Sequence, residues 1–137
     1  MPLAAFHRPG LDRFTRTFEE LFYAAEPISM ISYYTDQAHL MADGIAPIQD
    51  HDAIEQFWRT AIDRAAAAEA RRTIQLHESH CSGELGYALC TVTVEIPGLT
   101  RRASWDATVW RHGTDGGWRI AVDISTLLPP DPQTGKS

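Results

Sequence analysis

The chain has 137 residues, 44% of them hydrophobic and 22% charged, and its formal net charge at pH 7 is −6. This length suits one domain that can bury a core and one internal pocket. The acidic balance argues against nucleic acid as a partner, because neither Arg71-Arg72 nor Arg101-Arg102 extends into a basic tract. No segment approaches the roughly 20 apolar residues of a membrane span. The N-terminus also lacks the basic region of a signal peptide, so we expect a cytoplasmic protein with no membrane partner.

Two helices are predicted near the N-terminus. Apolar residues at spacings of three and four indicate an amphipathic helix between Pro9-Gly10 and Pro27. Its apolar stripe comprises Leu11, Phe14, Phe18, Leu21, Phe22 and Ala25. Pro27 can itself begin a short second helix that runs through Tyr34, because proline suits the first helical position.

A strand and a short return follow these helices. The run from Ala38 to Ala42 is strand-like, and Asp43-Gly44 ends it with a strong turn signal. Residues 45–48 predict a short returning strand.

The third predicted helix is long. It begins at Asp50 or Asp52, and Asp52 has the spacing of a capping box with Glu55. Its apolar stripe comprises Ile54, Phe57, Trp58, Ala61, Ile62 and Ala65. The Ala-rich sequence favours a continuous helix to about Ala70.

After Arg72 the apolar pattern changes to period two, which is typical of strands. The predicted strands cover residues 73–81, 85–96, 102–111 and 118–126. This order predicts an α+β domain with a cone-shaped, curved antiparallel or mixed sheet, in which three helices of the N-terminal half enclose a pocket. We expect the single domain to span residues 1–128 and the Pro-rich segment 129–137 to be a flexible tail.

The stretch from Ser104 to Ile124 carries two carboxylates among large apolar residues. Regular alternation places on one face of the first strand Asp106, Thr108 and Trp110. On the second strand it places Asp123 and Ser125 opposite a face made of Trp118, Ile120, Val122 and Ile124. If Asp106 lies in a partly dry pocket, its pKa is raised and it is a candidate acid, base or hydrogen-bond donor. The alternative is a solvated Asp106, or one paired with Arg102 or Arg119.

Two segments resemble a known family. The segment YYTDQAHLMADGIAPIQDHDAIEQFW is similar to the SnoaL-like and steroid-isomerase-like signature of a Tyr-x-Asp helix end, a strand, a proline and a capped helix. The segment VWRHGTDGGWRIAVDIS resembles the closing hairpin of that group, and together the two cover most of residues 30–126. The resemblance implies the cone fold of the nuclear transport factor 2-like superfamily. That superfamily holds isomerases, cyclases, hydrolases, dehydratases and non-catalytic pockets, so the fold leaves the function open.

The resemblance also implies roles for particular residues. In the steroid isomerases of this fold a first-strand carboxylate is the base, while a first-helix Tyr and a protonated Asp on the third meander strand donate to the oxyanion. The protonated Asp corresponds to Asp106, and Trp110 matches the aromatic residue that follows it. The base position falls on Met41 or Ala42, next to Asp43.

Two parts of the family pattern do not match. The first-helix Tyr position falls near Phe18, and either Tyr33 or Tyr34 could replace that donor from the second helix. Epoxide hydrolases with the same cone use an Asp–Arg–Asp set, for which Asp106 and Asp123 could be the acids. Ser104 stands where that set has its arginine.

The sequence therefore predicts a carboxylate site with apolar walls. Asp106 is the expected neutral donor or acid, and Asp123, Asp43 and His39 are alternatives for the base. The expected ligand-binding residues are Phe18, Tyr34, Met41, Trp58, Tyr87, Thr108 and Trp110.

No cofactor and no metal are expected. The run from His77 to Cys81 lacks a metal-ligand spacing, because on a regular strand His77 and His80 point to opposite faces. Cys81 and Cys90 are interpreted as small buried thiols of a reducing compartment rather than as a disulfide.

Three functions remain open. The first is a SnoaL-like small-molecule pocket, with isomerase, cyclase or dehydratase chemistry on a small apolar carbonyl compound if it is catalytic. The second is a non-catalytic module that binds a ligand or dimerises; both faces of residues 85–96 are apolar, which favours a homodimer through the sheet. The third is a subunit that stabilises a larger enzyme.

Overall fold

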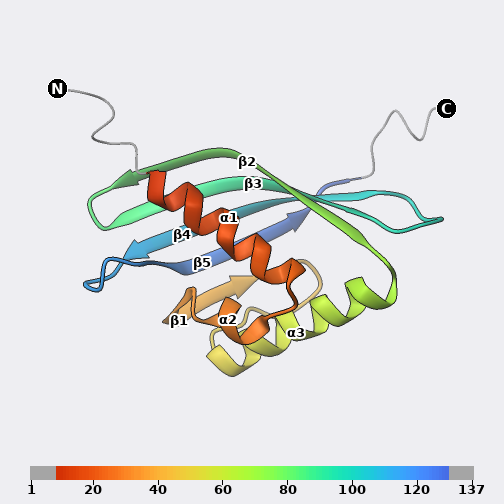
Figure 1. Ribbon diagram of the computed structural model, residues 1–137, viewed down its shortest axis with the longest axis horizontal. Helices are drawn as coiled ribbons and strands as arrows, with labels where there is room; N and C mark the ends of the chain where they lie inside the picture. The colour runs from red at the N-terminus through yellow and green to blue at the C-terminus, as the bar shows by residue number, and fades with distance from the viewer. Residues whose placement is uncertain (1–8, 130–137) are drawn as a thin grey trace.

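The computed structural model describes residues 9–129, and this part of the chain contains helices and strands in the predicted order (Figure 1). The elements are α1 (Pro9–Tyr23), α2 (Pro27–Ile31), β1 (Tyr34–Met41), α3 (His51–Ala67), β2 (Arg71–Ser82), β3 (Leu85–Glu95), β4 (Arg102–His112) and β5 (Trp118–Leu127). The predicted tail lies outside the described residues except for Pro129.

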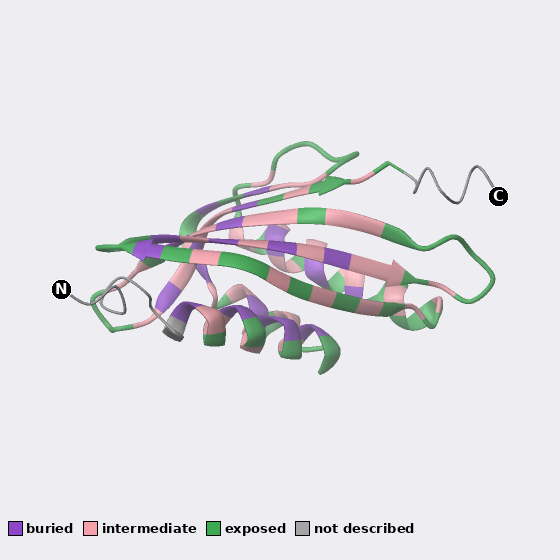
Figure 2. Cartoon of the chain, turned by 90° about the horizontal axis from the view of Figure 1, so that it is seen from above, coloured by how far each residue is buried: buried purple, intermediate pink, exposed green. Residues whose placement is uncertain are grey.

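The strands form one mixed sheet in the order β1-β5-β4-β3-β2. The meander from β2 to β5 is antiparallel, and β1 pairs in parallel with β5 at the edge. Figure 1 shows α1 crossing one face of the sheet, with α2 and α3 beside β1. In Figure 2 the buried residues of α1 face the sheet and its exposed residues face away. This α+β cone agrees with the predicted fold class.

The ends of α3 follow from local chemistry. Asp50, rather than Asp52, is the N-cap, since its Oδ1 accepts a hydrogen bond of 3.3 Å from the Asp52 backbone N–H. Glu55 pairs with Arg59 on the next turn, so the predicted capping box does not form. The helix ends at Ala67 because Glu69 adopts a left-handed conformation with φ of 54°, and the chain turns toward β2.

The first strand differs from its prediction. It begins at Tyr34, so the second helix is shorter than the sequence pattern indicates. The predicted return strand at residues 45–48 is reduced to one bridge, in which Leu40 and Ile48 exchange backbone hydrogen bonds of 2.8 and 2.9 Å. Tyr34 is 2% exposed, so its strand position directs the phenol into the core.

A β-bulge in β5 overturns the regular alternation assumed for that strand. Val109 pairs with Val122 and Trp110 pairs with Ile120, which leaves Ala121 as an extra residue. A bulge reverses the facing of every later side chain relative to the earlier ones. Asp123 is therefore 5% exposed on the inner face with Ile120, and Ile124 is 40% exposed. The prediction that Asp123 and Ile120 lie on different faces of the strand is therefore wrong.

A second bulge changes the facing of β2. Leu76 pairs with Cys90 and Glu78 pairs with Leu89, so His77 is the extra residue. The rings of His77 and His80 then contact Trp105 and Tyr87, which both lie on the outer face of the sheet. The prediction that these histidines face opposite sides is wrong. Among residues 9–129 no group of three or more His, Cys, Asp or Glu could hold a metal ion.

Candidate active site in the cone

A cavity of about 330 Å³ lies between the inner face of the sheet and α3. Its walls are mainly apolar and include Phe22, Leu40, Phe57, Trp58, Val92 and Ile96. This volume is at the lower end of the range for small-molecule sites, about 300–1,000 Å³. The cavity therefore has room for a ligand of modest size with a largely apolar body.

Two carboxyl groups lie side by side in the wall of this cavity. Asp106 of β4 pairs across the ladder with Ser125, and Asp123 of β5 pairs with Thr108, so the two aspartates are diagonal neighbours. They share the inner face because of the bulge at Ala121, and they lie close enough for each carboxyl group to shift the pKa of the other. Both line the cavity.

A hydrogen-bonded chain fixes the deeper carboxyl group. The Tyr34 hydroxyl donates to Asp123 Oδ2 at 2.7 Å, and the Trp58 indole Nε1 donates to the Tyr34 hydroxyl at 2.9 Å. All three side chains are buried. These hydrogen bonds orient the Asp123 side chain. Their donors, Tyr34 of β1 and Trp58 of α3, come from the N-terminal half of the sequence.

The surroundings raise the pKa of both aspartates. Burial raises the pKa of Asp106 well above its ordinary value of 3.8, and the charge of Asp123 raises it further. Burial also raises the pKa of Asp123, which is partly offset by the hydrogen bonds from Asp106 and Tyr34. Of the two groups, Asp106 has the more strongly raised pKa, so it is the better candidate for the protonated member of the pair.

Neighbouring groups stay protonated. Burial and then the charge of Asp123 raise the pKa of Tyr34 well above 10.0, so its phenol remains a donor. Burial and then the charge of Asp106 raise the pKa of Cys90 from 9.0 to about 12. Cys90 lies opposite Asp106 in the ladder but is a neutral thiol rather than a nucleophile.

A buried ion pair also reaches the cavity. Arg72 of β2 lines it, and Arg72 Nη1 donates to Glu19 Oε1 of α1. The Arg72 and Glu19 side chains are 13% and 6% exposed. The guanidinium carbon of Arg72 lies 4.5 Å from the centre of the Phe22 ring and 5.8 Å from that of Trp58.

The sequence interpretation missed this ion pair, although it left a signal. Glu19 lies within the apolar stripe of α1, where a charged side chain is buried if the helix packs as predicted. Arg72 precedes Ile74 and Leu76 with period two, which assigns it to the inner face of β2. A charged residue of each sign on two buried faces predicts a pair, but it does not show that the pair borders a cavity.

The other predicted site residues are divided between the cavity, the core and the surface. Met41 and Trp58 line the cavity. Phe18 lies in the core, where its ring centroid is 5.8 Å from that of Tyr34 and 5.4 Å from that of Trp58. Thr108 and Trp110 are also in the core, where Trp110 Nε1 donates to Thr108 Oγ1 at 2.8 Å.

Three predicted residues lie away from the carboxyl pair. Tyr87 is on the outer sheet face and donates to Glu78. Asp43 is exposed, and its Oδ2 accepts a hydrogen bond from the Leu127 backbone N–H. His39 is exposed and has its Nε2 3.2 Å from Gln49 Nε2.

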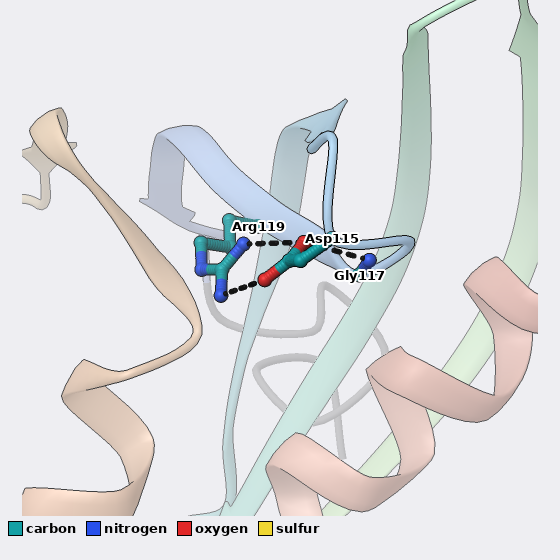
Figure 3. A network of polar contacts seen from close by, with 3 residues as sticks. All are labelled: Asp115, Gly117 and Arg119. Carbon is teal, nitrogen blue, oxygen red and sulfur yellow. Dashed lines mark hydrogen bonds and ion pairs between the residues drawn. The ribbon is translucent and has the colours of Figure 1, made fainter.

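Arg119, one of the two arginines considered as partners of Asp106, is engaged elsewhere. Arg119 binds Asp115 through two hydrogen bonds of 2.8 and 3.2 Å in the β4–β5 turn, and Gly117 N–H donates to Asp115 Oδ1 at 3.0 Å (Figure 3). Arg119 therefore does not neutralise Asp106, whose carboxyl group faces the cavity.

Comparison with known proteins identifies the fold. No family model matches the chain, and no curated protein sequence matches it. An NTF2-like protein with a cystatin-like fold from Novosphingobium aromaticivorans has a TM-score of 0.78 and 15% identity, over 94% of this chain and 86% of that one. A ketosteroid isomerase-like protein from Erwinia carotovora has a TM-score of 0.73 and 16% identity, over 89% and 96%. A candidate dehydratase of the NTF2-like family from Streptomyces avermitilis has a TM-score of 0.72 and 12% identity, over 88% and 96%.

The chain thus has the fold of the nuclear transport factor 2-like superfamily, as its sequence resemblance implies. At these identities the likeness concerns the fold alone. No helix within residues 9–129 is both long enough and apolar enough to cross a bilayer.

Proposed function

We propose that the protein is a SnoaL-like pocket enzyme that transfers protons on a small, mostly apolar carbonyl compound, as in an isomerisation, an aldol-type cyclisation or a dehydration. The observation that carries this proposal is the pair of neighbouring carboxyl groups, Asp106 and Asp123, in the wall of an apolar cavity. Two neighbouring carboxyl groups with raised pKa values suit a site in which one group donates a proton and the other accepts one. The cytoplasmic location stays a prediction from the sequence.

In this proposal the two aspartates have different roles. Asp106 is the protonated member of the pair, and it donates its proton to the carbonyl oxygen of the ligand. Asp123, oriented by Tyr34, accepts the proton that leaves the carbon next to the carbonyl group. The product of these two transfers is an enol. Asp123 then returns its proton to a different carbon while the enol hydroxyl gives its proton back to Asp106, which yields an isomeric ketone and restores both carboxyl groups. Apolar walls strengthen the hydrogen bond to the developing enolate because they exclude water.

The test is a screen for turnover with small cyclic enones and β-hydroxy ketones, followed by the Asp106→Asn variant. Asparagine keeps the shape and one donor but cannot release a proton. We expect the rate to fall by about 10²–10⁴-fold, the usual contribution of a general acid or base. Asp115→Asn, in the exposed turn of Figure 3, is the matched control and should leave the rate unchanged. An activity that survives Asp106→Asn with a loss of less than about threefold would rule out the assigned role.

A second candidate function, a dimerising module without chemistry, is favoured by the outer face of the sheet. Trp105 and Ile124 on this face are 39% and 40% exposed, and Leu89, Val109 and Val122 lie beside them half-buried. A stable homodimer needs about 800 Å² of such surface on each partner. The combined Trp105→Glu and Ile124→Glu variant should be monomeric in analytical ultracentrifugation where the unmodified chain is dimeric. An unmodified chain that sediments as a monomer at 100 μM would exclude the dimer.

A further inference from the structure

We propose that Arg72 is the specificity-determining residue of this cavity, and that it selects ligands with a neutral carbonyl oxygen, which it holds together with Asp106. The inference rests on the proposed function, because it concerns the same cavity, but it is a statement about binding and not about turnover.

The guanidinium of Arg72 is held in place by its neighbours but still has N–H donors available for a ligand. Glu19 engages Nη1, and the guanidinium carbon lies close to the rings of Phe22 and Trp58, which also line the cavity. A guanidinium has five N–H donors. Within residues 9–129 the Arg72 side chain donates one hydrogen bond, to Glu19. Its other N–H donors therefore remain for a ligand.

Arg72 and Asp106 line the same cavity without binding each other. The ion pairs formed within residues 9–129 do not join Arg72 to either aspartate. Arg72, Asp106 and Asp123 all line the cavity, and the charge of Arg72 partly offsets the rise in pKa that burial causes in both aspartates. A ligand oxygen in that space can accept from the guanidinium and from the protonated Asp106 at once.

The balance of charge indicates what kind of oxygen fits. Arg72 is already paired with Glu19, and burial raises the pKa of both aspartates, which means that the site disfavours their charged forms. A carboxylate ligand would place a further negative charge at this buried site, whereas a neutral ketone or aldehyde accepts the same hydrogen bonds without that cost.

The Arg72–Glu19 pair also ties α1 to β2, and a purely structural tie is the alternative to be tested. Such a tie predicts that loss of Arg72 weakens all ligands equally or unfolds the protein. An anchor for oxygen predicts instead that loss of Arg72 removes only the preference for ligands that carry an acceptor.

The experiment measures the affinity of three matched probes by isothermal titration calorimetry. The probes are 2-acetonaphthone, which has a neutral carbonyl, 2-ethylnaphthalene, which has no acceptor, and 2-naphthoate, which is an anion. A benzene molecule fits a cavity of about 150 Å³. A two-ring skeleton therefore suits this cavity, whose volume is about 330 Å³. We expect the ketone to bind roughly 10- to 100-fold more tightly than the hydrocarbon, as for a hydrogen bond to a charged group, and the anion to bind more weakly than the ketone.

The main variant replaces both partners, Glu19→Met with Arg72→Met, because removal of Arg72 alone would leave Glu19 buried and unpaired. It should bind 2-ethylnaphthalene within about threefold of the unmodified protein and lose the preference for the ketone. Arg72→Lys, which keeps a charge for Glu19 but loses the planar fork, is the second variant and should lose most of the preference. Arg59→Met, at an exposed ion pair of α3, is the control.

Two outcomes overturn the inference. Either the preference for the ketone persists in both Arg72 variants, or 2-naphthoate binds more tightly than 2-acetonaphthone to the unmodified protein. These outcomes differ from failure of the proposed function, which is binding of the ketone without turnover of any enone. Absence of binding by all three probes would also overturn the inference, whereas the proposed function is judged by the turnover screen alone.

Discussion

The raised pKa values of the carboxyl pair make a prediction about stability that needs no ligand. The pKa of Asp106 is above its unfolded value of 3.8, so the folded protein holds a proton that the unfolded chain has released. Stability from such a group is fully present below the unfolded pKa and is lost as the pH rises through the folded pKa. In that window the free energy of unfolding falls by about 1.4 kcal/mol per pH unit for the one proton. Asp106→Asn removes the proton while its amide can still donate to Asp123.

The variant should therefore gain on the unmodified protein as the pH rises. We expect the difference in unfolding free energy to grow by up to about 1.4 kcal/mol per pH unit from about pH 4 toward the folded pKa, and then to level off. Urea unfolding at half-unit steps from pH 4 to pH 8 measures this difference. Burial also raises the pKa of Glu19, but this contribution is present in both proteins and cancels in the difference. Asp115→Asn is the control, because hydrogen bonds from Arg119 and Gly117 lower the pKa of Asp115 and its contribution is constant above pH 5. Parallel curves for Asp106→Asn and the unmodified protein would refute a shared buried proton.

Two further predictions concern the residues around the pair. Tyr34→Phe should destabilise the fold by roughly 2–5 kcal/mol, because it removes a donor to a buried carboxylate and leaves the Trp58 N–H without its acceptor. Tyr33→Phe, which alters no hydroxyl hydrogen bond found within residues 9–129, is its control, and equal losses for both in urea unfolding would contradict the assignment. The bulge in β5 predicts that Ile120→Ala costs about 2–5 kcal/mol and Ile124→Ala less than about 1 kcal/mol, whereas regular alternation predicts similar costs. Guanidinium chloride unfolding of the two variants distinguishes these cases.

Much of the fold could be predicted because it depends on local periodicity. The apolar stripes of α1 and α3 and the alternation in β3 and β4 are properties of each segment by itself, and their order indicates the cone. Asp106 could be assigned to the inner face because β4 carries no extra residue before it. These parts of the structure require no knowledge of which segment packs against which.

The partners of Asp106 could not be predicted in the same way. The facing of Asp123 depends on one extra residue in β5, and a bulge is set by the pairing with β4 rather than by the sequence of β5 alone. Tyr34 was expected at a helix end, and its bond to Asp123 joins residues 89 positions apart. Arg72 and Glu19 are 53 positions apart, and their meeting depends on how α1 crosses the sheet.

The extra residue in β5 has a consequence for how proteins of this shape are compared. Insertions are usually sought in loops, yet here a single inserted position inside a strand decides whether the next carboxylate meets the ligand or the solvent. Consider two relatives whose closing strands have the same residue types, one with the inserted residue and one without it. They would present different side chains to the cavity. Alignments that permit no gap within this strand would match an interior acid to an exterior one and transfer the wrong activity.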